Sequence, residues 1–307
     1  MANQTLPEGE VHPQNDVIYE FSPDMNARWT VHPGDSLTVR TIDSLIGAVQ
    51  SEDDLLHEVP DEVNAATGPI AIEGAELGMV LAVEIADIRV PEDIGRVTVL
   101  PGFGLHHDHP ELDAPRTRIT PIDETEASFK GIDAPLEPMI GTIGVAPASE
   151  SFTTIVPHDH GGNLDTTDIA AGTTAYFPVF QSGALLAMGD SKAVMGDGEV
   201  SGTGAEVATE IDLTIDLIKD PAVPLDRPLL ETEDAWKTVA SAETLELAVE
   251  LANEDLIRCL QHEHGFDFTD AYMLSSLVAD LEISQVVDPL VTVRNAVSKE
   301  YLDDPLR

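Results

Sequence analysis

Residues 157–206 carry the densest set of chemically capable side chains in this 307-residue chain. Histidines, acids and asparagine alternate there with many glycines, and apolar runs such as AYFPVF and GALLAM lie between them. Glycine adopts positive φ and lets the backbone approach a ligand, so its mixture with acids and imidazoles is typical of a binding or catalytic site. The apolar runs are typical of buried strands that would hold the loops in place.

Possible ligand pairs recur with one residue between the two partners. They are His158/His160, Asn163/Asp165, Asp197/Glu199 and, upstream, His107/His109. On extended backbone such pairs project to one face, which suits two ligands of one cation. Imidazole with carboxylate favours zinc, whereas carboxylate and amide oxygens alone favour calcium or magnesium. The alternative interpretation is that the acids belong to a solvated acidic surface, although the glycines flanking Asp197 argue against it there.

The elements expected to position these residues are mostly strands. Residues 81–88 and 206–218 alternate apolar and polar side chains, which is the pattern of half-buried strands. After about residue 235 the pattern becomes helical, with one helix from residue 243 to about 262 and a second over 271–281. This order predicts a mainly β, sandwich-like fold with appended C-terminal helices, α+β as a whole. Residues 1–235 would form the β-rich catalytic core, and residues 236–307 a helical region packed on it.

The charge composition limits the kinds of partner that the protein can bind. The chain has 57 acidic against 15 basic residues, a formal net charge of −42, which is typical of the hydrated acidic shell of a halophilic protein. No basic stripe is present, which argues against nucleic-acid binding. The single cysteine, Cys259, fits a reducing compartment. No secretory signal or long apolar run is found, so we expect a cytoplasmic protein with no membrane partner.

Several segments resemble the acetamidase/formamidase family of amide hydrolases. The resemblance is strongest in PHDHGGNLDT, YFPVFQSGALLAMGD and AVMGDGEV, and with weaker segments it extends from residue 31 to residue 288. It implies a jelly-roll-like β-sandwich with helices near the C-terminus and hydrolysis of formamide- and acetamide-like substrates to acid and ammonia. It also implies a homodimer or higher homo-oligomer and, as in some members, bound zinc or calcium.

The same resemblance assigns roles to single residues. It implies that a divalent metal, zinc or calcium, is held within a set of five side chains: Asp43, His160, Asp165, Asp190 and Asp197. We expect Glu199 to act as general base, since neighbouring acids would raise its pKa. We expect Asn163, with the backbone amides of Gly161 and Gly162, to stabilise the oxyanion. Lys192 stands where the family usually has histidine, and it would neutralise the acidic cluster or bind a substrate carboxylate.

Two other functions stay open at this point. Lys192 and the altered segment after Asp43 favour a binding or structural protein that keeps the fold without the activity. The retained HGGNLD and GDGE segments oppose that interpretation. A lysine that faces the pocket would instead favour hydrolysis of a larger or cyclic amide.

Overall fold

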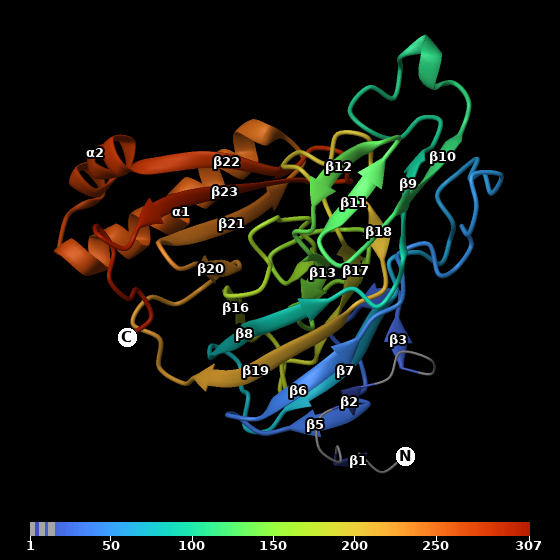
Figure 1. The fold of residues 1–307 in the computed structure, drawn as a ribbon. Helices are drawn as coiled ribbons and strands as arrows, with labels where there is room; N and C mark the ends of the chain where they lie inside the picture. Colours follow the sequence, from blue (N-terminus) through green and yellow to red (C-terminus); the bar gives the residue numbers. More distant parts are fainter. Residues whose placement is uncertain (1–3, 6–9, 12–15) are drawn as a thin grey trace.

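Two large β-sheets form the body of the protein in the computed structural model, which describes residues 4–5, 10–11 and 16–307. Within these residues one sheet has ten strands and the other nine. Figure 1 shows α1 (Leu245–His264) beside β21 and β23 at one end of the molecule, and the paired strands β9 and β10 at the other. The mainly β fold with C-terminal helices that the sequence predicted is confirmed.

The first sheet contains β1 (Gln4–Thr5), β3 (Val17–Ile18), β5 (Trp29–Val31), β7 (Ala66–Ile72), β9 (Ile94–Val99), β10 (Arg116–Pro121), β13 (Met139–Gly144), β15 (Gly161–Asn163), β17 (Leu186–Lys192) and β18 (Glu206–Val207). The second contains β2 (Glu10–Val11), β6 (Ser36–Arg40), β8 (Val80–Arg89), β16 (Thr174–Pro178), β19 (Glu210–Ile218), β20 (Leu229–Glu231), β21 (Ala235–Ala242), β22 (Ala279–Gln285) and β23 (Val291–Ser298). Two smaller pairs are β4 (Glu20–Phe21) with β14 (Phe152–Thr153), and β11 (Glu126–Phe129) with β12 (Ile132–Pro135). A 3₁₀ turn spans Pro110–Leu112, and the second helix is α2 (Phe268–Val278).

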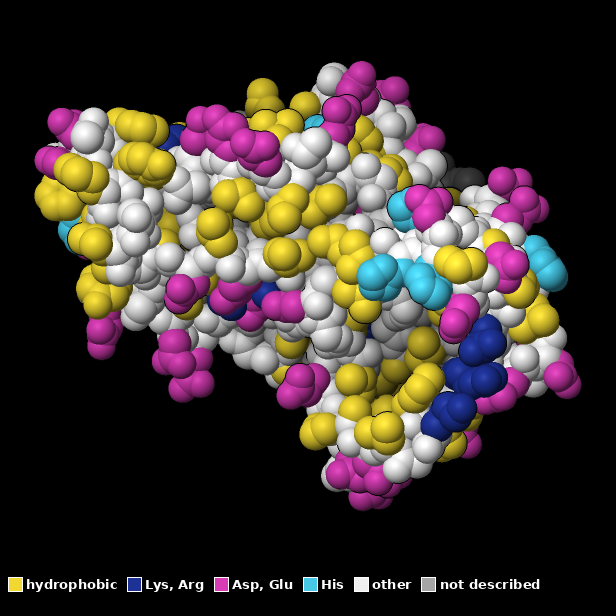
Figure 2. Space-filling view, turned by 90° about the horizontal axis from the view of Figure 1, so that it is seen from above, with side chains coloured by type: hydrophobic (Ala, Val, Ile, Leu, Met, Phe, Trp, Pro, Cys, Tyr) yellow, Lys and Arg dark blue, Asp and Glu magenta, His cyan; other side chains and the backbone are white. Residues whose placement is uncertain are grey.

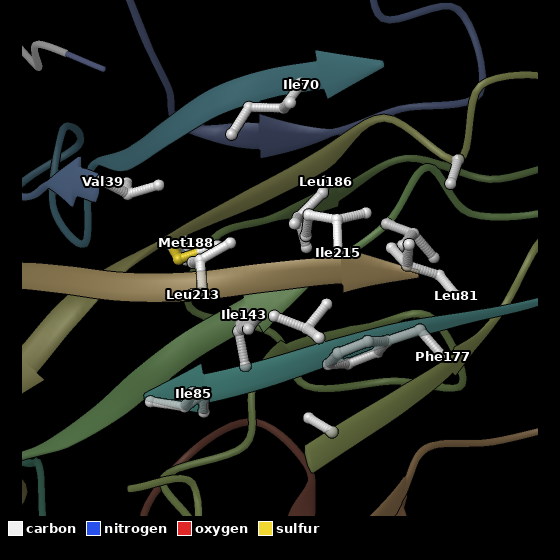
Figure 3. Packing of buried hydrophobic residues seen from close by; sticks show 14 of the residues in the cluster. Val39, Ile70, Leu81, Ile85, Ile143, Phe177, Leu186, Met188, Leu213 and Ile215 are labelled. Atoms are coloured by element: carbon white, nitrogen blue, oxygen red, sulfur yellow. The ribbon is translucent and has the colours of Figure 1, made fainter. Parts of the chain in front are cut away.

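The main hydrophobic core lies between the two sheets. In β19, the apolar residues Ile211, Leu213 and Ile215 are buried at every second position, because successive side chains of a strand point to opposite faces. They meet apolar side chains of the first sheet, among them Leu186 and Met188 of β17 (Figure 3). Each such side chain contributes about 1.5–3 kcal/mol when fully buried. This core fixes the position of β17, the strand that leads into the site.

The C-terminal region differs from the helical appendage that the sequence predicted. The first helix is confirmed as α1, capped by the Thr244 side chain at its start and by Gly265 with φ 66° at its end. The second helix was expected to reach residue 281, which is wrong: α2 ends at Val278. Residues 279–285 instead form β22, because this run pairs with β23 along the open edge of the second sheet. Three strands of the region therefore belong to the second sheet.

The surface carries the acidic side chains that the composition requires. Figure 2 shows them spread over one face of the molecule, with basic side chains gathered in fewer places. Neither α1 nor α2, the helices of the described chain, has both the length and the apolar character of a membrane span.

Candidate active site

A buried lysine forms the centre of the site. Lys192 is the last residue of β17, and only 2% of it is exposed. Its Nζ donates to Asp165 Oδ1 at 2.5 Å and to Asp190 Oδ2 at 2.6 Å. Burial opposes the charge of Nζ, but the carboxylates of Asp165 and Asp190 hold the pKa of Lys192 well above its usual range. The Nζ of Lys192 thus faces buried acids that it can neutralise, which is one of the two roles that the sequence left open for this lysine.

Further acids surround this ammonium from different elements. Glu199 lies in the turn after β17, and its Oε1 is 3.7 Å from Lys192 Nζ. Asp288 follows β22. Burial, and then the charge of Asp165, raise the pKa of Glu199 and of Asp288 well above the usual range. Burial likewise raises the pKa of Asp190. Such shifts move carboxyl groups toward the pH range in which they exchange protons during catalysis.

Two asparagines connect these acids. Asn64 Nδ2 donates to Asn163 Oδ1 and to Asp190 Oδ2, both at 3.1 Å. Asn163 Nδ2 donates to Asp288 Oδ2 at 2.8 Å, while Asn163 Oδ1 also accepts from the Thr142 hydroxyl at 2.5 Å. The amide groups therefore fix the orientation of the carboxylates through hydrogen bonds that hold in a buried environment.

Several site residues have backbone conformations that are uncommon outside glycine. The φ angles are 51° for Asn64, 41° for Asp165, 54° for Asp190 and 44° for Glu199. Asparagine and aspartate tolerate this region better than glutamate does. Each such residue costs about 1–3 kcal/mol, so the surrounding structure must hold it in place, and this kind of strain concentrates at functional sites.

The cluster opens into a small cavity of about 50 Å³. The polar side chains on its wall include Asn163, Lys192 and Glu199, whereas Asp165 stands behind Lys192 and does not reach it. The wall is completed by apolar and other polar side chains: Ser44, Leu45, Leu56, Val59, Pro60, Val63, Asn64, Leu100, Phe103, Ile155, Asp190, Thr203, Glu206 and Asp288. An apolar cavity with a few convergent polar groups is the usual form of a small-molecule site.

Asn163 reaches this cavity, but the neighbouring backbone amides that were expected to join it do not. Gly161 and Gly162 are not among the residues of the cavity wall. The N–H of Gly161 instead donates to the carbonyl of His158 at 3.0 Å, within the turn that leads into β15. The cavity wall therefore does not support the oxyanion role that was predicted for these two glycines.

Asp43 is buried beside the cavity but serves the chain around it. Its carboxylate accepts the backbone N–H of Leu45 at 3.1 Å and of Gly47 at 3.0 Å. These bonds hold the turn that places Ser44, whose hydroxyl donates to Glu206 Oε2 at 2.7 Å on the cavity wall. Burial raises the pKa of Asp43. The residue shapes the wall and does not line it.

His160 is enclosed by aromatic rings. Its ring centre lies 4.9 Å from that of Phe21 and 5.2 Å from that of Phe152. Burial, and then the charge of His158, lower the pKa of His160 to about 3, so the imidazole is neutral at physiological pH. Both ring nitrogens are buried and have no hydrogen-bond partner. The ring therefore packs against these two aromatic side chains, and no group of carboxylates gathers around it to support its predicted place as a metal ligand.

Asp197 belongs to a different network. It accepts from Arg294 Nη2 at 2.5 Å and Nη1 at 3.1 Å, and from the Thr167 hydroxyl at 2.8 Å. Its side chain is 45% exposed. Asp197 thus pairs with a buried arginine at the surface, while Glu199, two residues later, turns into the cavity.

The five residues predicted as metal ligands are thus not gathered around one point. Across residues 4–5, 10–11 and 16–307, no three His, Cys, Asp or Glu side chains are arranged to hold one metal ion. Asp165 and Asp190 do meet, but they meet at the ammonium of Lys192. His107 and His109 lie in an exposed loop. The residues present do not fit a zinc or calcium ion.

Sequence reasoning missed several members of the site. Asn64 and Asp288 join the cluster from remote segments, and no local pattern marks them. Gly141 on β13 is another: a Cβ there would collide with Asp165 Oδ1 and Lys192 Nζ and would lie 2.5 Å from the carbonyl oxygen of Asp190. Gly141 lies within the stretch of residues 31–288 over which the family resemblance extends, but only the structure shows that its missing side chain leaves room for Asp165 and Lys192.

Comparison with known proteins gives consistent results. The model of the acetamidase/formamidase family matches residues 8–152 and 148–302. A formamidase of Methylophilus methylotrophus is 27% identical over 272 residues, covering 69% of this chain and 65% of that protein. An acetamidase of Mycolicibacterium smegmatis is 28% identical over 264 residues, covering 65% of each chain. The chain thus spans 65% of the length of these curated relatives.

A solved structure covers more of the chain. The crystal structure of an acetamidase from Bacillus halodurans superimposes with a TM-score of 0.89 at 38% sequence identity. The similarity covers 93% of this chain and 96% of that one. The whole arrangement of sheets and helices is therefore similar to that of this structure.

Proposed function

Because the chain belongs to the acetamidase/formamidase family, we propose that it hydrolyses the C–N bond of short aliphatic amides, giving a carboxylate and ammonia. The relatives named formamidase and acetamidase support this substrate class. The observation that carries the proposal is that Lys192 and Glu199, an ammonium and a carboxyl of raised pKa, face one small cavity.

The volume of the cavity supports a small substrate. A water molecule needs roughly 10–15 Å³ of such space. A cavity of about 50 Å³ therefore holds about three to five atoms the size of a water oxygen. Formamide and acetamide fall in this range. A larger or cyclic amide does not fit without movement of the wall, so the small amides are the favoured class.

Lys192 is placed to polarise the amide carbonyl. Two of its three N–H groups donate to Asp165 and Asp190. Glu199 Oε1, at 3.7 Å, is too far away to accept a hydrogen bond from Nζ. The third N–H makes only a long contact, 3.4 Å from Nζ to the carbonyl oxygen of Asp190, and we assign it to a substrate carbonyl oxygen that lies beside Glu199. Because the ammonium is held in advance in a buried site, it stabilises the negative charge that develops on this oxygen.

Glu199 is placed to move the proton. In its ionised form it takes a proton from a water molecule, whose oxygen bonds to the amide carbon. The tetrahedral intermediate then collapses, the C–N bond breaks, and Glu199 returns the proton to the leaving nitrogen as ammonia departs. The new carboxylic acid loses its own proton to give the carboxylate. The raised pKa of Glu199 suits both halves of this exchange.

These roles leave no place for a substrate carboxylate on Lys192. Two protein carboxylates already accept from its Nζ, and several other acids surround it. A third negative group would raise the electrostatic energy of the cluster. Of the two roles that the sequence left open for this lysine, neutralisation of the acids is the one that the geometry supports.

Ammonia release from formamide and acetamide tests the proposal. Glu199→Gln should lower kcat by about 10²–10⁴-fold, the usual contribution of a general acid–base. Glu84→Gln makes the same chemical change on the exposed face of β8 and should leave the rate unchanged. Near-normal turnover by Glu199→Gln would remove the assigned role, and absence of ammonia release by the wild-type protein from every short amide would refute the function itself.

We also propose that the protein works as a homo-oligomer in a high-salt cytoplasm. The acidic surface supports the salt requirement, because a net charge of −42 is self-repulsive unless salt screens it. Exposed apolar side chains on α2 and β22 support self-association: Leu277 is 81% exposed and Leu281 is 57% exposed. Sedimentation across a salt series measures the oligomeric state and how it depends on salt. A monomer at every salt concentration would refute the proposed oligomer.

A further inference from the structure

We infer that the ammonium of Lys192 takes the place of a divalent cation between Asp165 Oδ1 and Asp190 Oδ2, so that the chain binds no metal at that point. This inference is independent of which amide is hydrolysed. It assigns to a covalently attached lysine the charge that a bound ion would otherwise supply, and it rests on the position, the surroundings and the charge of Nζ.

The position of Nζ excludes a metal ion shared by Asp165 Oδ1 and Asp190 Oδ2. The oxygens Asp165 Oδ1 and Asp190 Oδ2 converge on Nζ at 2.5 and 2.6 Å, and Glu199 Oε1 approaches to 3.7 Å. Zinc and magnesium bind carboxylate oxygens at about 2.0–2.2 Å, and calcium at about 2.3–2.6 Å. An ion shared by Asp165 and Asp190 would therefore overlap the nitrogen atom. Ammonium and metal ion are alternatives at this point.

The backbone around Lys192 is shaped for the lysine side chain. Lys192 lies on a central strand, paired with Met139 of β13 on one side and with Glu206 of β18 on the other. A Cβ on Gly204 would lie 2.6 Å from Lys192 Cγ, and a Cβ on Gly141 would collide with Nζ. Glycines from two neighbouring segments thus leave the space that the long side chain fills. This space exists at both the stem and the tip of Lys192.

The charge of the cluster also favours the ammonium. Asp165, Asp190 and Lys192 are almost fully buried, and a buried carboxylate pair requires a positive partner or a proton. His160, the neighbouring imidazole that the sequence offered as a ligand, is neutral and enclosed by Phe21 and Phe152. It does not gather with the carboxylates into a group that holds an ion. Lys192 is thus the positive charge that faces both carboxylates.

Two substitutions separate the position of Nζ from the rest of the site. Lys192→Ala removes the ammonium and opens its place, whereas Lys192→Met removes the charge but fills most of the space. We expect Lys192→Ala to gain binding of zinc, calcium or magnesium, with a rise in Tm of about 4 °C at about 100 times Kd. The wild-type protein and Lys192→Met should show no such rise with the same ions.

Metal content of the wild-type protein gives the second measurement. Protein purified without a metal-affinity step and assayed by mass spectrometry should contain no stoichiometric metal, and a chelator should leave ammonia release unchanged. One bound metal per chain, with activity lost to chelator and restored by that metal, would overturn the inference. If Lys192→Ala fails to fold, this measurement decides alone. If the wild-type protein hydrolyses no amide, the proposed function fails, while metal content and the Tm series still decide the role of Lys192.

Discussion

Replacing Lys192 by methionine tests whether the site depends on one buried charge. Methionine keeps most of the apolar stem and lacks the ammonium. In the wild-type protein the side chains of Lys192 and Asp190 are 2% exposed and that of Asp165 is fully buried. Removing one partner of a buried ion pair typically costs about 3–5 kcal/mol. We expect Lys192→Met to lower the free energy of unfolding by about this amount near neutral pH.

The loss should depend on pH in a defined direction. Burial already raises the pKa of Asp190, and without the ammonium this pKa rises further. An acid whose pKa is higher in the folded state binds more protons when folded, so its stability contribution falls as pH rises. The slope is about 1.4 kcal/mol per pH unit for each such group between its unfolded and folded pKa values. The deficit of Lys192→Met should therefore be small at acidic pH and grow toward alkaline pH.

Urea unfolding followed by circular dichroism, at fixed high salt and several pH values from about 5.5 to 8.5, measures this deficit. Lys299→Met is the matched control, because Lys299 Nζ donates to Glu231 at 2.9 Å but its side chain is 33% exposed. Such a pair is worth about 0–1 kcal/mol. Equal unfolding midpoints for the two variants at every pH would refute the reasoning, since the buried ammonium of Lys192 would then stabilise the fold no more than the partly exposed one of Lys299.

Two further predictions concern the cavity wall and the enclosed histidine. Phe103 lines the cavity, so Phe103→Ala should raise kcat/KM for butyramide relative to acetamide by about tenfold or more, as one or two methylenes are worth 1–3 kcal/mol each; an unchanged ratio in the ammonia assay would show that Phe103 does not limit the acyl group. The pKa of His160 is lowered to about 3 by burial, so its stability contribution is complete above about pH 6.5 and is lost as pH falls toward 3. In His160→Phe, the slope of the free energy of unfolding against pH should be smaller over that range by up to about 1.4 kcal/mol per pH unit. If circular dichroism gives this variant the same acid unfolding curve as the wild-type protein, the neutral, buried imidazole is contradicted.

The sequence was sufficient where the signal is local or repeated. The alternation in residues 206–218 predicted a strand because the period of side chains along a strand is two, whatever its neighbours. β19 (Glu210–Ile218) confirms most of it, whereas residues 206–207 form β18 in the other sheet. The helical pattern that begins near residue 243 predicted α1, because this signal lies within the helix itself. The family resemblance pointed to Glu199, Asn163 and Lys192, and all three line the cavity. Local chemistry was enough to find these parts.

The sequence was insufficient where partners come from far along the chain. Residues 279–285 have the composition of a helix end, but the free edge of β23 turned them into a strand. Asp197 and Glu199 are two residues apart, yet Arg294 draws the first to the surface while the second faces the cavity. From their spacing alone, the two residues were predicted to be a pair of ligands of one cation.

What the sequence by itself determined is therefore the family, the mainly β architecture and the residue types of the site. Only the tertiary structure decided which of the acids lie around the ammonium of Lys192. Asn64, Asn163, Lys192 and Asp288 come from segments separated by up to 224 residues, 288 minus 64, and they meet because strand pairing brings them together. Electrostatic energy depends on the distance between charges and on their burial, and the order of residues in the sequence gives neither.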